Sequence, residues 1–88
     1  MKKIGDRCNL SELKIGQKAI VKSLKFEDKQ IRRHLLDMGV TRGVRVEIKK
    51  IAPMGEPIDL ELRGYELALR KSELKNIEVE VVGWWKLL

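Results

Sequence analysis

The sequence is poor in cysteine, histidine, proline and aromatic residues, and it has no long apolar run. It contains one cysteine, one histidine, two prolines and four aromatic residues among 88. A single cysteine excludes a disulfide within the chain, and no apolar stretch approaches the roughly 20 residues that a membrane-spanning helix needs. The first ten residues, MKKIGDRCNL, lack the apolar segment of a secretory signal. We therefore expect a soluble protein of a reducing, cytoplasmic compartment.

Charged residues are abundant and unevenly distributed. They make up 36% of the chain, hydrophobic residues make up 43%, and the formal net charge is +6. Residues 1–50 contain 14 basic and 6 acidic residues, whereas residues 51–88 contain 5 and 7. A basic half is compatible with a nucleic acid, an anionic membrane surface or an acidic protein as partner, or with solubility alone. The length predicts one domain.

Short segments of alternating apolar and polar residues predict strands separated by turns. The apolar positions of three such segments are Val44, Val46 and Ile48; Ile58, Leu60 and Leu62; and Ile77, Val79 and Val81. Glycines mark the predicted turns, at Gly39, Gly43, Gly55 and Gly64. About five short strands with regular turn signals are typical of a small barrel. We expect a mainly β fold, an SH3-like antiparallel barrel over residues 1–80 with one inserted helix, followed by an apolar tail over residues 81–88.

The inserted helix is predicted in the segment FEDKQIRRHLLDMG. Asp28 is the expected N-cap, and Gly39 the expected stop. At about 100° per residue, Ile31, Leu35 and Met38 share one face, which we expect to point inward. Leu36 falls away from that face.

Few residues offer catalytic or metal-binding chemistry. His34 and Cys8 are the only histidine and the only cysteine, and a cysteine nucleophile would need that histidine as its base. We predict no catalytic residues. Stable transition-metal sites take three or four ligands, so His34 is a weak candidate ligand for Fe²⁺ or Zn²⁺, and its alternative role is that of a half-packed residue at the rim of the helix.

Apolar and basic residues outside the predicted core favour a protein partner. The expected contacts are Arg32, Arg33, Leu36, Met54, Trp84 and Trp85. Met54 lies in a corner stiffened by Pro53 and Pro57, which lowers the entropy lost when a contact forms. The tail VVGWWKLL has two alternatives: it folds back on its own barrel, or it docks on another chain, either a second copy or a different protein. Nucleic-acid binding is less favoured, because only Phe26 among the aromatic residues lies among basic ones.

Four blocks of the sequence resemble the FeoA family, the ferrous iron transport protein A family. They are LSELKIGQKAIVKSL, IRRHLLDMGVTRGVRVEI, PMGEPIDLELRGYELALRKSE and NIEV, and together they run from Leu10 to Val79. The resemblance implies an SH3-like barrel with an inserted helix. It also implies a non-enzymatic accessory protein of ferrous iron uptake, with the cytosolic GTPase region of the membrane transporter FeoB as its partner.

The resemblance leaves one alternative function and contains two departures. The alternative is a metal-responsive adaptor that binds a transition metal ion or nucleic acid, because iron-dependent repressors contain the same barrel. Leu74 stands where the family has a smaller residue, and the tail extends past the usual end. We expect both departures to raise the apolar surface near the C-terminus and to favour self-association.

Overall fold

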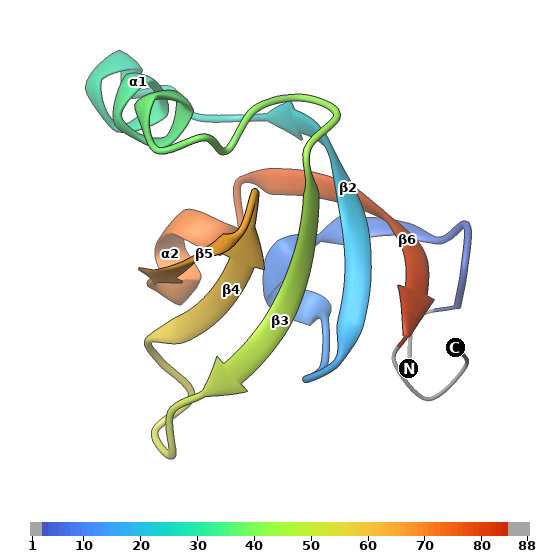
Figure 1. Ribbon diagram of the computed structural model, residues 1–88. Coiled ribbons are helices and arrows are strands. Elements are labelled where there is room, and N and C mark those ends of the chain that lie inside the picture. Colours follow the sequence, from blue (N-terminus) through green and yellow to red (C-terminus); the bar gives the residue numbers. More distant parts are fainter. Residues whose placement is uncertain (1–2, 85–88) are drawn as a thin grey trace.

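The structure is a computed structural model that describes residues 3–84, with the side chain of Trp84 left aside. Its six strands form one antiparallel sheet in the order β1-β6-β2-β3-β4-β5 (Figure 1). The strands are β1 (Arg7–Asn9), β2 (Gln17–Leu24), β3 (Arg45–Ile51), β4 (Ile58–Leu62), β5 (Tyr65–Leu69) and β6 (Ile77–Trp84). The helices are the single 3-10 turn η1 (Leu10–Glu12), α1 (Lys29–Asp37) and α2 (Lys71–Leu74). The mainly β, SH3-like architecture with an inserted helix is confirmed, with one strand more than expected.

The additional strand is β1, which the sequence pattern did not predict. It has three residues and pairs with β6 through Cys8 and Val79. A strand this short contains at most one alternation of polar and apolar residues, so its periodicity cannot be distinguished from that of a loop.

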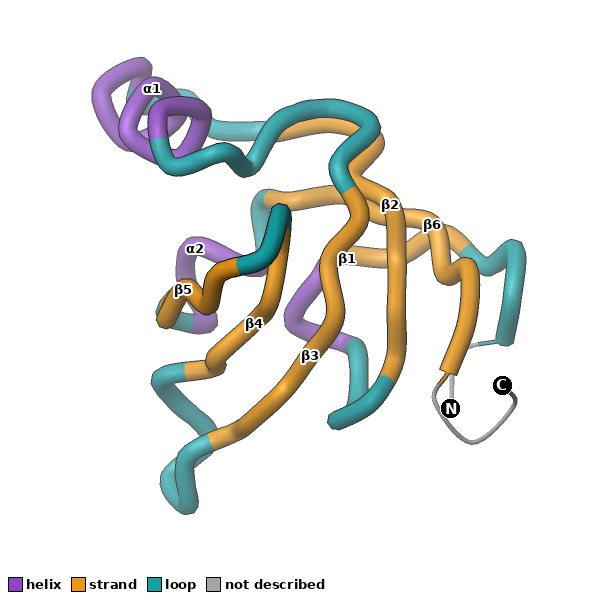
Figure 2. The backbone as a smooth tube through the Cα atoms, in the orientation of Figure 1, coloured by secondary structure: helices purple, strands orange, loops and turns teal. Residues whose placement is uncertain are grey.

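The sheet curls around a single core (Figure 2), to which η1 contributes Leu10 and α2 contributes Leu74. All nine apolar positions that the alternation assigned to the interior are buried, with exposed fractions of 7% or less. Leu74 is also fully buried, so the expectation that this departure adds exposed apolar surface was wrong: α2 turns its side chain into the core.

Helix α1 begins as predicted, but it buries only one residue. Asp28 Oδ1 accepts hydrogen bonds from the backbone N–H groups of Gln30 (2.8 Å) and Ile31 (3.4 Å). Leu35 is fully buried, Met38 is half-buried, and Leu36 is exposed as expected. The expectation that Ile31 faces the core was wrong, since 40% of it is exposed. Figure 1 shows α1 beyond the end of β2, at one extremity of the domain. The core therefore reaches only the C-terminal turn of α1, where Leu35 lies.

The predicted glycine turns are present, and each of the four has a positive φ: Gly39, Gly43, Gly55 and Gly64. Gly64 and Arg63 form the two-residue loop between β4 and β5, and both have positive φ, as a type I′ hairpin turn requires. This turn pairs Leu62 with Tyr65 and thereby sets the register of the hairpin.

The last strand is longer than expected. Residues 81–84, which we assigned to the tail, belong to β6, and the backbone of Trp84 pairs with Gln17 of β2. Residues 85–88, including Trp85, lie outside the described part of the chain.

Candidate functional site

Three of the predicted contact residues form one outward patch on α1. Arg32, Arg33 and Leu36 are all exposed, and the helical repeat places them within about 100° of one another, with the centre of the patch about 110° around the helix from Leu35. Among the described residues, neither arginine forms an ion pair or a side-chain hydrogen bond. The patch therefore presents two available cations around one leucine.

Met54 lies at the other end of the molecule from this patch. Its side chain is 91% exposed, at the tip of the turn between β3 and β4. The turn is anchored to α2, because the carboxylate of Glu56 accepts a hydrogen bond from the backbone N–H of Lys71 at 3.1 Å. The seven residues of β3 separate the two groups by about 20 Å. One small contact could not cover both.

The two tryptophans of the predicted contact set lie at the limit of the described residues. Trp84 is paired in the sheet through its backbone. Its side chain and the whole of Trp85 are outside the described residues, so their role as contacts stays a prediction.

A shallow groove between α1 and α2 was missed by the sequence reasoning. It has a volume of about 560 Å³ and is lined by Gln30, Ile31, His34, Arg70, Ser72 and Glu73. Its two walls come from segments about 40 residues apart in the chain. Nothing in the periodicity of either helix indicates that they face each other, and the only local signal, the isoleucine at position 31, was assigned to the core.

The structure does not bring His34 and Cys8 together. His34 lines the groove between α1 and α2, whereas Cys8 lies in β1 and lines a different hollow beside Lys25 and Lys75. No three histidine, cysteine or carboxylate side chains within residues 3–84 are grouped in a way that could hold a metal ion. In the same part of the chain, every buried side-chain nitrogen and oxygen has a hydrogen-bond partner.

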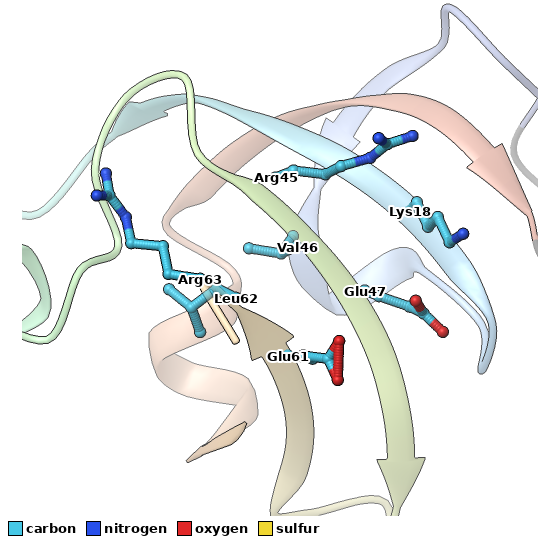
Figure 3. Close-up of a pocket in the computed structure, with 7 residues that line it drawn as sticks. All are labelled: Lys18, Arg45, Val46, Glu47, Glu61, Leu62 and Arg63. Atoms are coloured by element: carbon cyan, nitrogen blue, oxygen red, sulfur yellow. The ribbon is translucent and has the colours of Figure 1, made fainter. Parts of the chain in front are cut away.

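A second hollow, of about 260 Å³, lies over β2, β3 and β4 and is lined by charged residues (Figure 3). Lys18, Glu47 and Glu61 are neighbours across the strands, with Lys18 opposite Glu47 and Glu47 opposite Glu61. Figure 3 shows the two carboxylates side by side, while Arg63 extends away from them. The guanidinium of Arg63 instead donates a hydrogen bond to Thr41 Oγ1 at 2.9 Å. Lys49 forms an ion pair with Glu47 at 3.4 Å, which leaves Glu61 without a cation among the described ion pairs.

None of the helices in the described part of the chain could cross a bilayer, since the longest, α1, has nine residues.

The curled six-stranded sheet, with a helix inserted between its second and third strands in sequence, defines a small SH3-like domain. The sequence profile of the FeoA domain matches residues 8–81. The chain therefore belongs to the FeoA domain family.

Two solved structures illustrate the likeness. The FeoA-like protein from Clostridium acetobutylicum is 44% identical, with a TM-score of 0.79 over 94% of this chain and 92% of that one. A FeoA from Stenotrophomonas maltophilia, solved in complex with zinc and described as a prokaryotic SH3 domain protein, is 32% identical. Its TM-score is 0.72, and the match covers 82% of this chain and 88% of that one.

A third relative contains a similar domain within a much longer chain. It is the Fe(2+) transport protein A/Fe(2+) transporter FeoB fusion protein of Porphyromonas gingivalis, which is 30% identical over 75 residues. The match covers 84% of this chain but only 9% of the fusion protein. Together with the family assignment, it favours a function connected with ferrous iron transport over the metal-responsive or nucleic-acid-binding adaptor.

Proposed function

We propose that this chain is a non-enzymatic, cytoplasmic accessory of ferrous iron uptake that docks on the GTPase region of a FeoB-type transporter and modulates Fe(II) transport. The observation that carries the proposal is the fusion protein of P. gingivalis, in which a similar domain and the transporter share one polypeptide. Joining two domains raises the effective concentration of each for the other, typically to the millimolar range for short linkers. A domain on a separate chain has no such linker, so it has to bind the transporter through its own surface.

The outward patch of α1 suits such a contact. Leu36 supplies an apolar centre, and Arg32 and Arg33 supply two cations that no described carboxylate neutralises. Arginines surrounding an apolar anchor are common among the residues that dominate binding energy at protein interfaces. Met54 is a second contact at the far end of β3.

The proposed mechanism requires no bond to be made or broken by this chain. A partner that contacts one conformation of the transporter more favourably than another shifts the transporter toward that conformation, by as much as the difference in affinity. Docking on the transporter also brings the accessory protein to the inner face of the membrane.

Binding to the purified cytosolic GTPase region of the cognate transporter tests this proposal. The intact chain should bind, and Leu36→Glu should weaken binding, because a carboxylate replaces the apolar centre of the patch. Ile15→Glu is the matched control, since Ile15 is 50% exposed in the turn between η1 and β2, away from α1. No binding by the intact chain would overturn the proposed function. Equal binding by both variants would overturn the proposal that the outward patch of α1 is a contact surface.

The tail can be tested separately for self-association. Because Trp84 is paired within the sheet, a chain that ends at Trp84 removes residues 85–88 without shortening β6. We expect sedimentation velocity to show a smaller species for this truncated chain than for the intact chain at the same concentration. If both chains sediment as monomers, these residues do not mediate pairing.

A further inference from the structure

Strand β5 leaves one edge of the sheet open. The strand order places it at the end of the sheet, and within the described residues it pairs with β4 alone. Because the two-residue turn makes Leu62 and Tyr65 a hydrogen-bonded pair, every second residue of β5 bonds to β4. The backbone N–H and C=O groups of the residues in between, Glu66 and Ala68, therefore point away from β4.

These outward groups have no hydrogen-bond partner within residues 3–84. Glu66 and Ala68 are both exposed, and neither takes part in the backbone hydrogen bonds of turns, loops and caps. The open edge ends after Leu69, because the N–H of Arg70 donates to the carboxylate of Glu73 at 3.0 Å and its C=O accepts from α2. An edge strand invites pairing unless prolines, bulges or very short length prevent it. Strand β5 has five residues, no proline and an unbroken register.

The edge is complementary to a second copy of itself. When two copies pair antiparallel with Leu67 opposite Leu67 at a two-fold axis, Glu66 of each chain lies opposite Ala68 of the other. Each of these two pairs exchanges both of its N–H···O bonds, so every outward backbone group of both edges is satisfied. An axis at Glu66 would instead place like charges opposite each other. An axis at Ala68 would need the backbone groups of Arg70, which are already bonded.

The charges at this edge are also complementary. Glu66 and Arg70 are exposed, and neither forms an ion pair among the described residues. Arg70 continues the extended backbone of β5, with φ −87° and ψ 156°, so it becomes a diagonal neighbour of Glu66 of the second copy. Long side chains can reach each other across such a diagonal of about 7–8 Å. The outward face around the axis thus contains one arginine for each glutamate, although the whole chain carries +6.

We propose that this chain forms a two-fold symmetric dimer in which the β5 edges of two copies pair antiparallel about Leu67 and join the two sheets. The inference goes beyond the proposed function and depends neither on it nor on the tail. At the axis the half-buried Leu67 side chains face each other, and Tyr65, which is 42% exposed, lies opposite Leu69 of the second copy. A contact of five residues per chain is small, so the dimer should dissociate on dilution.

Opposite charge changes at Ala68 test the register in the full chain. Sedimentation velocity between about 10 μM and about 1 mM should show a concentration-dependent dimer of the intact chain. Ala68→Lys places a cation opposite Glu66 of the second copy, twice in each dimer, and should lower the dimer Kd about tenfold. Ala68→Glu places a carboxylate there and should raise the Kd by a similar factor.

The net charge of the chain predicts the reverse order for these two variants. Ala68→Lys makes a chain of +6 more positive and more self-repelling, whereas Ala68→Glu makes it less so. If both variants pair as the intact chain does, or if their order follows the net charge, the proposal is overturned. Urea unfolding establishes that both variants are folded.

Introduced cysteines locate the two-fold axis. In a Cys8→Ser background, Leu67→Cys places two thiols opposite each other with Cα atoms about 4.5 Å apart, which suits a disulfide. Ala68→Cys is the matched control: it is the more exposed position, but it is diagonal to its own counterpart, about 7–8 Å away. Mild oxidation should cross-link Leu67→Cys faster. Equal or faster cross-linking of Ala68→Cys would overturn the proposed register.

Backbone amide exchange distinguishes pairing at β5 from pairing elsewhere. The amides of Glu66 and Ala68 should exchange more slowly as the chain concentration rises, whereas that of Leu67, which bonds to β4, should change little. A chain that ends at Trp84 should show the same behaviour. If the intact chain is monomeric at about 1 mM, the dimer is overturned and the proposed function stands. If the chain pairs but these two amides do not respond, the contact lies elsewhere and the β5 proposal is overturned.

Discussion

The hydroxyl oxygen of Tyr65 lies 2.8 Å from the position that a Cβ atom at Gly39 would occupy. Gly39 ends α1, and Tyr65 begins β5, so this approach brings the inserted helix against the β4–β5 hairpin. The hydrogen bond from Arg63 to Thr41 joins the same two regions. The helix that carries the patch and one wall of the groove is thus positioned at its C-terminal end by the hairpin.

Substitutions at two glycines separate this contact from backbone strain. Gly39 and Gly43 have nearly the same positive φ, +96° and +89°, but a Cβ atom at Gly43 would have no heavy atom within 4 Å. Each alanine variant should lose about 1–2 kcal/mol because an L-residue is strained in this conformation. Gly39→Ala should lose more than Gly43→Ala in urea unfolding, because the Tyr65 hydroxyl has to move. When the two alanine variants are made in a Tyr65→Phe background, the difference between their losses of unfolding free energy should become smaller. An unchanged difference would show that the contact with the Tyr65 hydroxyl contributes nothing.

Two adjacent leucines of α1 should respond in opposite ways. Leu35 is fully buried and Leu36 is 37% exposed. Leu35→Ala should lower the free energy of unfolding by about 2–5 kcal/mol through lost burial and a new cavity. Leu36→Ala should change it by less than about 0.5 kcal/mol while weakening partner binding. Chemical denaturation with the binding assay measures both quantities, and a large stability loss at Leu36 would contradict the exposed position that the structure gives it.

Glu61 should be a destabilising residue. In the sheet it stands directly between Glu47 of β3 and Glu66 of β5. Like charges that face each other across strands cost roughly 0.2–1 kcal/mol each. Glu61→Gln should therefore raise the free energy of unfolding at neutral pH by about that amount. Added salt should narrow the difference, because it screens the repulsion in the original chain. Asp59→Gln, on the same strand opposite Lys50 and Ala68, is the control and should not stabilise the protein.

Metal ions alone should stabilise the isolated chain little. His34 has no pair of further ligands grouped with it in residues 3–84. A site that favours the folded state raises stability by about 2.7 kcal/mol when the metal concentration is one hundred times Kd. We expect Fe²⁺ under anaerobic conditions, or Zn²⁺, to leave the melting temperature nearly unchanged, and His34→Ala to behave identically. A metal-dependent rise that disappears in His34→Ala would establish the site that the described geometry lacks.

The sequence by itself determined five of the six described strands, the turns and the cap of the helix. Successive side chains of a strand point to opposite faces, so alternation of apolar and polar residues indicates that one face is buried. Val46, Leu60 and Val79 could therefore be assigned to the core without coordinates. The helix N-cap at Asp28 and the hairpin turn at Gly64 could also be predicted, because a cap and a tight turn depend only on neighbouring residues. The family likeness used the same local signals in their order along the chain.

Only the tertiary structure decided which residues the helix leaves exposed and what faces them. Periodicity places Ile31 and Leu35 on one side of α1, but how far the core extends along that side depends on where the helix stands relative to the sheet. The pairing of β1 with β6, the burial of Leu74 and the row of carboxylates through Glu61 depend likewise on segments distant in sequence. Local patterns specify which way a side chain turns relative to its own backbone, whereas contact between two elements is fixed by the packing of the whole domain.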